Sequence, residues 1–198
     1  MRFFTVISLL IILFTMHCDN PFFPPRPATD RPLEIADELP NSPVGVINQL
    51  FKSYKYRSIG LYTSLLASDF RFYVASGFAS TKFQPIKDTM PDTFMVHVPT
   101  SNSFNYWGYA AEVNSTKNMF DNTRSIEIDQ YQMSAPIYHN DSLYAEVMVS
   151  NLMLHIIIDI GFEYVEYTIA NKPQVFLLKQ IEDDVWVIWK WYDLGTEG

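Results

Sequence analysis

The sequence predicts an α+β domain in which N-terminal helices pack in a curved antiparallel sheet. Between residues 43 and 56 the apolar side chains recur every three or four positions, which is the period of an amphipathic helix. From Ser125 onward the period changes to two, and the breaks between segments are short and contain Asn, Asp, Gly or Pro. Such short breaks force neighbouring strands to run antiparallel. An order in which helices come first and a meander of strands follows is typical of α+β folds.

Two helices are predicted before the first strand. Asn41 or Ser42 provides an N-cap for a helix that has a proline at its first position and ends near Tyr56. Ser58 caps a second, shorter helix, with Tyr62 on its buried side. A third helix is predicted later in the chain, with Asn105 as its cap and an apolar stripe that runs to residue 120.

Six segments show the two-residue period of strands, and one of them is unusually long. The segment 143–159 is too long to stay flat, so it is expected to bend or to carry a bulge and to give the sheet a concave face. Residues 75–104 contain three prolines and are predicted to be an active loop or lid in which 93–98 fits one strand. The predicted strands are 69–74, 125–133, 143–159, 163–170, 174–182 and 185–193.

The first 41 residues contain a predicted targeting signal and a predicted tether. Arg2 precedes fourteen apolar or hydroxyl residues, too few to span a bilayer as a helix, which favours a secretory signal. Cys18, the only cysteine, lies two positions after this run, and this arrangement resembles the bacterial lipoprotein signal. The resemblance implies removal of residues 1–17, lipidation of Cys18 and a place in the bacterial envelope, on the periplasmic side if the source is Gram-negative. The alternative is an ordinary secretory signal followed by a free thiol.

Residues 18–41 contain half of the twelve prolines and are predicted to be an extended tether between the anchor and a domain at 42–195. The alternative is an N-terminal arm that packs on the domain through Phe22 and Phe23.

Composition excludes several classes of function. The 198 residues are 48% hydrophobic and suit one well-filled domain. Fourteen Lys and Arg against 22 Asp and Glu give a net charge of −8, so nucleic acid is not an expected partner. No histidines have the spacing of metal ligands and no second cysteine is present, so no metal is predicted. The sequence has neither a Gly-rich phosphate loop nor a nucleophile elbow, and no cofactor is predicted.

Several strings in a fixed order resemble the nuclear-transport-factor-two-like superfamily, which includes the SnoaL-like cyclases and ketosteroid isomerase. The string VFLLKQIEDDVWVIWKWYD at 175–193 resembles the closing hairpin of that family, although Asp184 and Val185 stand where the family has a turn glycine. Residues 58–72 resemble its second helix and following strand, and 107–121 a helix of envelope lipoproteins with this domain. The resemblance implies a sheet curled around the first helix into a cone with a pocket at its mouth. It does not carry over the catalytic residues of any member.

Candidate site residues follow from these elements. Tyr62, Tyr131, His155 and Trp191 are predicted to bind a ligand, because a polar tip on an aromatic body suits a mixed pocket. The resemblance directs Trp191 and Asp193 toward the interior of the cone, and His155 and Asp193 are the candidates for a catalytic base. The alternation of β-strands also places Tyr131 on one face with the carboxylates Glu127 and Asp129.

We therefore expect an envelope lipoprotein with a non-catalytic domain that binds a small apolar ligand or a partner protein. The chain lacks a convergent set of catalytic residues, and its 31 aromatic side chains (twelve Tyr, fifteen Phe and four Trp) favour binding. One alternative is an isomerase- or cyclase-like enzyme that uses a pocket His or Asp as base. Another is a structural subunit that forms a homodimer through its open sheet.

Replacing Cys18 by Ser is expected to release the protein from membranes, because the variant lacks the thiol that would accept the lipid. Fractionation of cells that express the wild type or the variant measures this directly. A variant that stays entirely in the membrane fraction would contradict the lipid anchor.

Overall fold

The computed structural model describes residues 40–75, 86–88, 95–98, 104–140, 142–159, 164–170 and 173–194. The predicted signal, Cys18 and nearly all of the predicted tether lie outside these residues, as does most of the predicted lid. None of the described helices is long and apolar enough to cross a membrane.

The first two predicted helices are confirmed. They are α2 (Pro43–Tyr56) and α3 (Ile59–Ser64). Each begins at the predicted cap, because the hydroxyl of Ser42 accepts a hydrogen bond from the Gly45 N–H and that of Ser58 from the Leu61 N–H. The N-terminal N–H groups of both helices thereby gain acceptors.

The third helix, α4 (Tyr109–Asn122), begins three residues later than predicted. Asn105 does not cap it. Residues Phe104–Gly108 instead form strand β3, in which Asn105 pairs with Val74 of β1 (Leu66–Ala75). Aromatic residues favour strands, and the Trp107 ring stacks on that of Phe72 in β1 with 4.6 Å between centroids. This cross-strand pair favours the extended conformation over an additional helical turn.

A nine-stranded sheet forms the rest of the described fold, in the order β2-β3-β1-β9-β8-β6-β4, with β5 and β7 also paired to β6. The six strands predicted from their two-residue period are confirmed, whereas β2 and β5 are too short to show a period and were not predicted. Residues 95–98 form a bend instead of the predicted strand. The remaining bounds are β2 (Ile86–Asp88), β4 (Thr123–Met133), β5 (Ile137–His139), β6 (Tyr144–Asp159), β7 (Tyr164–Ala170), β8 (Gln174–Glu182) and β9 (Val185–Asp193).

The sheet is mixed, so the prediction of a wholly antiparallel sheet was wrong at one pair. Strand β1 runs parallel to β9, and the other described strand pairs are antiparallel. A short turn fixes the relative direction of the two strands that it joins. Strands β1 and β9 are separated by most of the domain, so turn lengths do not set their direction.

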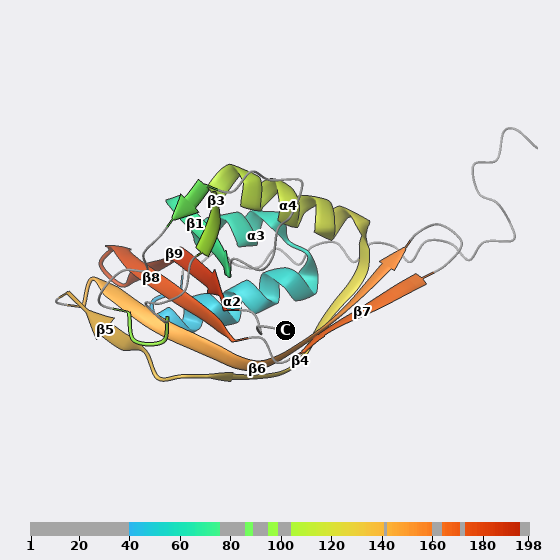
Figure 1. Ribbon diagram of the computed structural model, residues 1–198. Helices are drawn as coiled ribbons and strands as arrows, with labels where there is room; N and C mark the ends of the chain where they lie inside the picture. The colour runs from blue at the N-terminus through green and yellow to red at the C-terminus, as the bar shows by residue number, and fades with distance from the viewer. Residues whose placement is uncertain are drawn as a thin grey trace, which may run out of the picture. The chain divides into compact units, whose positions relative to one another are not determined.

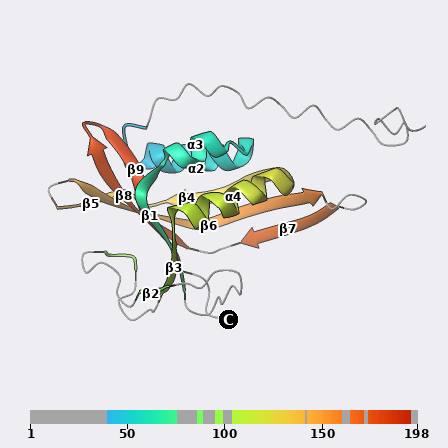
Figure 2. The same ribbon diagram turned by 90° about the horizontal axis from the view of Figure 1, so that it is seen from above.

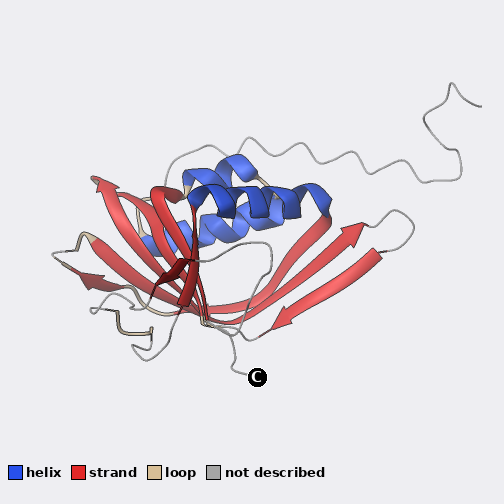
Figure 3. Ribbon diagram, turned by 45° about the horizontal axis from the view of Figure 1, so that its top comes forward, coloured by secondary structure: helices blue, strands red, loops and turns tan. Residues whose placement is uncertain are grey.

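The sheet curves, and the three helices lie on its concave side (Figures 1 and 3). Seen from above, α4 runs beside α2 and α3 across the sheet (Figure 2). In the main core, Val46, Ile47 and Leu50 of α2 are completely buried together with Val147 of β6 and Ile188 of β9. The predicted α+β class and the predicted packing of helices in a curved sheet are confirmed.

The predicted irregularity of the long strand is also confirmed, and it lies at Asn151. This residue has a φ of 53°, in the left-handed region that Asn enters more readily than most residues. Before it, Val147 and Val149 face the helices. After it, Leu154 and Ile156 face the helices instead. The irregularity therefore moves the core face of β6 from odd-numbered to even-numbered residues.

Strand β4 has a matching irregularity beside Asn151. Its register against β6 shifts between Ile128 and Gln130, and again between Gln130 and Gln132. Ile128 packs against the main core, and beyond the shift the Tyr131 ring lies 4.6 Å from that of Phe51 in α2. Both strands thus change their core face at the same level, where the sheet bends around α2.

A second apolar cluster lies on the opposite face of the sheet, which we call the outer face. Its members come from β1, β3, β8 and β9, and two residues of the bend at 95–98 complete it. They are Tyr73, Met95, Val98, Phe104, Val175, Leu177 and Tyr192.

Trp191 fills the helix side of the sheet where β9 meets β1 and β8. Its side chain is 8% exposed, and its ring centroid lies 4.8 Å from that of Phe176 and 4.9 Å from that of Phe72. The indole N–H donates a hydrogen bond to Oε1 of Gln174 at 2.5 Å. The ring is therefore part of the core and already has its polar partner.

Replacing Trp191 by Ala is expected to lower the free energy of unfolding by about 3–5 kcal/mol, through lost transfer energy and the cavity left behind. Urea denaturation of the two proteins measures this loss. A change below about 1 kcal/mol would contradict a core position, since most exposed substitutions stay within that range. Tyr138→Ala, at a half-exposed ring on β5, is the control.

Candidate functional site

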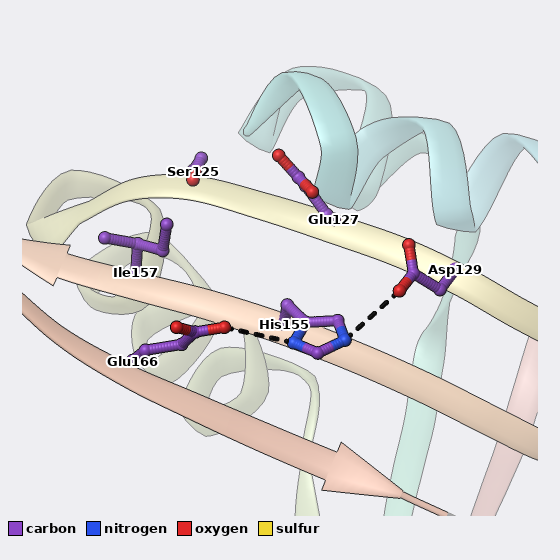
Figure 4. Close-up of a pocket in the computed structure, with 6 residues that line it drawn as sticks. All are labelled: Ser125, Glu127, Asp129, His155, Ile157 and Glu166. Atoms are coloured by element: carbon purple, nitrogen blue, oxygen red, sulfur yellow. Dashed lines mark ion pairs between the residues drawn. The ribbon is translucent and has the colours of Figure 1, made fainter.

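A polar cleft of about 210 Å³ lies on the outer face of β4, β6 and β7, and we call it the acidic cleft. Figure 4 shows His155 at its centre, with Asp129 and Glu166 on either side of the imidazole ring. The six residues that line the cleft are Ser125, Glu127, Asp129, His155, Ile157 and Glu166.

Both ring nitrogens of His155 face carboxylates. Nε2 lies 3.2 Å from Oδ2 of Asp129 on β4, and Nδ1 lies 3.3 Å from Oε1 of Glu166 on β7. The hydroxyl of Thr168, also on β7, is 3.1 Å from Nδ1. A protonated imidazole in this place interacts favourably with acids on two neighbouring strands, and therefore links all three strands of the cleft.

The irregularity at Asn151 decides that His155 belongs to this outer cleft. If β6 alternated without interruption, His155 would share the helix-facing side with Val147 and Val149. The shift in face turns it outward and brings it into register with Glu127 of β4 and Thr168 of β7. His155 therefore does not face the helix side of the sheet, to which Trp191 contributes its ring. The residue does line a cleft, on the other side of the sheet.

The cleft has an excess of negative charge. Three carboxylates and one imidazole line it, and the side chains of Asp129 and Glu166 remain 53% and 63% exposed. Water and salt screen such exposed charges, so the cleft provides a local attraction for cations and does not hold a dry ion pair. Its chemistry fits an ammonium or guanidinium group, to which carboxylate oxygens are the natural acceptors.

Tyr62, a predicted ligand-binding residue, is fully buried under the helices. Its hydroxyl donates a hydrogen bond of 2.6 Å to Oε1 of Glu112 on α4. The same carboxylate accepts hydrogen bonds from the indole N–H of Trp107 at 2.5 Å and from the hydroxyl of Thr116 at 3.1 Å. These contacts join α3, α4 and β3 inside the domain, so the Tyr62 hydroxyl serves the packing of the helices.

Tyr131 lies on the helix side of β4, against Phe51, with its hydroxyl 3.5 Å from Oδ1 of Asn48. Glu127 and Asp129 face the outer cleft instead. The prediction that Tyr131 shares a face with these acids was wrong, because the register shift between Ile128 and Gln130 interrupts the alternation.

The two predicted candidates for a catalytic base do not share a site. Asp193 ends β9, two positions after the core residue Trp191, and pairs in register with Gln174 and Val74. Alternation places it on the helix side, whereas His155 faces outward. The geometry therefore does not combine these two residues with one substrate.

Sequence reasoning missed a second polar site on the outer face. The sequence places His139 in a turn that we expected to be solvated. It lies in β5 instead, with a side chain 13% exposed and Nε2 3.5 Å from Oε2 of the buried Glu146. Glu146 also accepts a hydrogen bond from Nδ1 of His97. Glu146 lies within an apolar strand pattern that gave no sign of its partners.

Among the described residues no group of three or more His, Cys, Asp or Glu side chains could hold a metal ion.

Comparison of the sequence with family models and with curated proteins found no match. Solved structures match the fold. A conserved protein from Planctomyces limnophilus has a TM-score of 0.50 at 9% identity, over 75% of this chain and 89% of its own. A protein from Kribbella flavida has a TM-score of 0.50 at 6% identity, over 76% of this chain and 86% of its own. A ketosteroid isomerase-like protein from Erwinia carotovora atroseptica has a TM-score of 0.45 at 8% identity, over 77% of this chain and 94% of its own.

At such low identity these likenesses concern the fold alone. The described fold is the α+β arrangement that the sequence predicted, with helices packed in a curved sheet (Figure 1).

The buried Glu112 makes stability depend on pH. Burial raises the pKa of its carboxyl above the ordinary value, while the hydrogen bonds from Tyr62, Trp107 and Thr116 act in the opposite direction. The folded state therefore binds this proton more tightly than the unfolded state. The resulting stabilisation is complete below the unfolded pKa and is lost as the pH rises through the folded pKa.

Replacing Glu112 by Gln should remove this contribution. The free energy of unfolding of the wild type, relative to that of the variant, is expected to fall as the pH rises from about 4 to about 8. Urea denaturation across this range measures the difference, with Glu182→Gln as a control at an exposed carboxyl. Parallel pH profiles for wild type and Glu112→Gln would contradict the raised pKa.

Proposed function

We propose that the chain is an envelope lipoprotein whose cone-shaped domain is a non-catalytic module for binding a partner protein. The partner presents a lysine or arginine side chain to the acidic cleft on the outer face. The single observation that carries this proposal is that Glu127, Asp129 and Glu166 line one open cleft together with a single imidazole.

Packing in the main core favours a partner protein over a small apolar ligand inside the cone. The rings of Trp191, Phe72, Phe176 and Trp107 pack on one another, and the polar tips of Trp191 and Tyr62 already bond to other side chains. A ligand in this region would have to displace close-packed rings, which is costly in a dense core.

The placement of the candidate bases also favours binding over catalysis. An isomerase or cyclase needs its acid, base and oxyanion donors around one substrate. His155 and Asp193 come from opposite faces of the sheet, and the Tyr62 hydroxyl is bonded to Glu112.

The N-terminal sequence supports a role at a membrane surface. A lipid on Cys18 and a proline-rich stretch up to residue 41 would hold the domain close to the membrane yet leave its outer face accessible. Tethering raises the local concentration of a membrane-bound partner, so a modest contact at one charged cleft is enough for association.

Asp129→Asn is expected to weaken binding of an oligo-arginine peptide to the full chain in detergent about three- to ten-fold at low salt, because it removes one exposed carboxylate from the cleft. Fluorescence anisotropy of the labelled peptide measures the affinity. The matched control is Asp121→Asn, which removes an equally exposed carboxylate, paired with Lys117, from α4. That variant is expected to bind the peptide almost as the wild type does.

Equal weakening by the two variants would mean that the peptide responds only to net charge, and would refute the cleft as the binding site. Full affinity in Asp129→Asn would refute it as well.

A further inference from the structure

Glu146 is a completely buried acid on the outer face, far along β6 from the acidic cleft. In the sheet it pairs in register with Ile137 of β5 on one side and with Leu177 of β8 on the other. An ionised carboxylate in such a place is tolerated only when hydrogen-bond donors surround it.

Those donors come largely from the bend at residues 95–98. Oε2 accepts a hydrogen bond from the backbone N–H of Val96 at 2.8 Å. Oε1 accepts two, from the backbone N–H and from Nδ1 of His97, both at 2.7 Å. Nε2 of His139 in β5 lies 3.5 Å from Oε2. One side chain thus accepts two consecutive backbone N–H groups of a segment far from it in sequence.

The bend lies on the apolar cluster of the outer face through two side chains. Met95 and Val98 are 7% and 3% exposed and belong to the cluster with Tyr73, Phe104 and Tyr192. Val96 between them is 63% exposed. The bend is not a strand of the sheet, so no ladder of backbone hydrogen bonds fixes it there.

We propose that residues 95–98 form a strap that Glu146 latches onto the outer face, and that neutralising this carboxylate opens the strap and uncovers the aromatic cluster. An ionised carboxylate only accepts hydrogen bonds. Once protonated, one of its oxygens becomes a donor and a weaker acceptor, so the bonds from Val96 and His97 lose the strength that the negative charge gives them. The latch is therefore sensitive to protons by construction, and it lies outside the cleft assigned to partner binding.

The other charged groups around the latch come from three elements. His97 belongs to the strap itself and His139 to β5. On the β8 side the register partner Leu177 is apolar, and beyond it lies Lys190 of β9, whose ammonium is 4.4 Å from the centre of the Trp189 ring. Protonated imidazoles add positive charge beside the carboxylate and strengthen the latch, whereas a proton on Glu146 itself releases it.

Hydrogen exchange on the full chain tests this proposal. In Glu146→Gln the amides of Val96 and His97 are expected to exchange at least about ten-fold faster than in the wild type, while the amides of β9 keep their protection. His97→Ala retains both backbone bonds to Glu146 and is expected to accelerate exchange less. Binding of the dye ANS is expected to rise in Glu146→Gln, because the aromatic cluster becomes accessible.

Glu182→Gln, at an exposed position, is the control and should leave the strap protected. Unchanged protection of Val96 and His97 in Glu146→Gln would overturn the proposal. Equal acceleration in the strap and in β9 would overturn it too, since Glu146 would then stabilise the whole domain.

If Glu146→Gln does not fold, the wild type provides the same test on acidification. The protection of the strap, relative to that of β9, is expected to fall before β9 loses its own, and simultaneous loss would refute the latch. Neither result depends on the acidic cleft, so the proposed function can fail while the latch stands, or the reverse.

Discussion

The paired irregularities of β4 and β6 determine which side chains face the helices and which face outward. Asn151 on β6 and the register shifts after Ile128 on β4 lie at the same level of the sheet, and each moves the core face of its strand by one residue. Without them the long strands would present His155 to the main core and Tyr131 to solvent. With them, the sheet bends around α2, the apolar residues stay inside, and the acids of β4 meet His155 on the outer face.

Two buried carboxylates fasten separate parts of the chain to this bent sheet. Glu112 joins α3, α4 and β3 on the helix side through Tyr62 and Trp107. Glu146 holds the bend at 95–98 on the outer face. Most of the acids that the structure describes contact water, and these two are exceptions because donors from other elements surround them. Of the two, Glu112 has a pKa raised by burial, which makes the stability of the domain depend on pH.

Most of the fold could be predicted from the sequence, because its elements are marked locally. Ser42 and Ser58 cap their helices, and the two-residue period gave β8 and β9 to the residue. The site could not be predicted equally well. The face of His155 depends on a bulge whose position no period reveals, and Asn151 is the only local sign of it. The partners of Tyr62 and Glu146 are distant in sequence, so spacing alone could not bring them together.

The parallel pairing of β1 with β9 also concerns how the chain reaches its folded state. Because β9 lies between β1 and β8, the order of the sheet requires the last described strand to insert next to the first. During synthesis α2, α3 and β1 emerge early, and β1 can pair with β3, yet it lacks its second neighbour until residues near 193 are available. Contacts between such distant residues make folding slow, because a long loop must close first. The sheet can therefore be completed only after β9 has been synthesised.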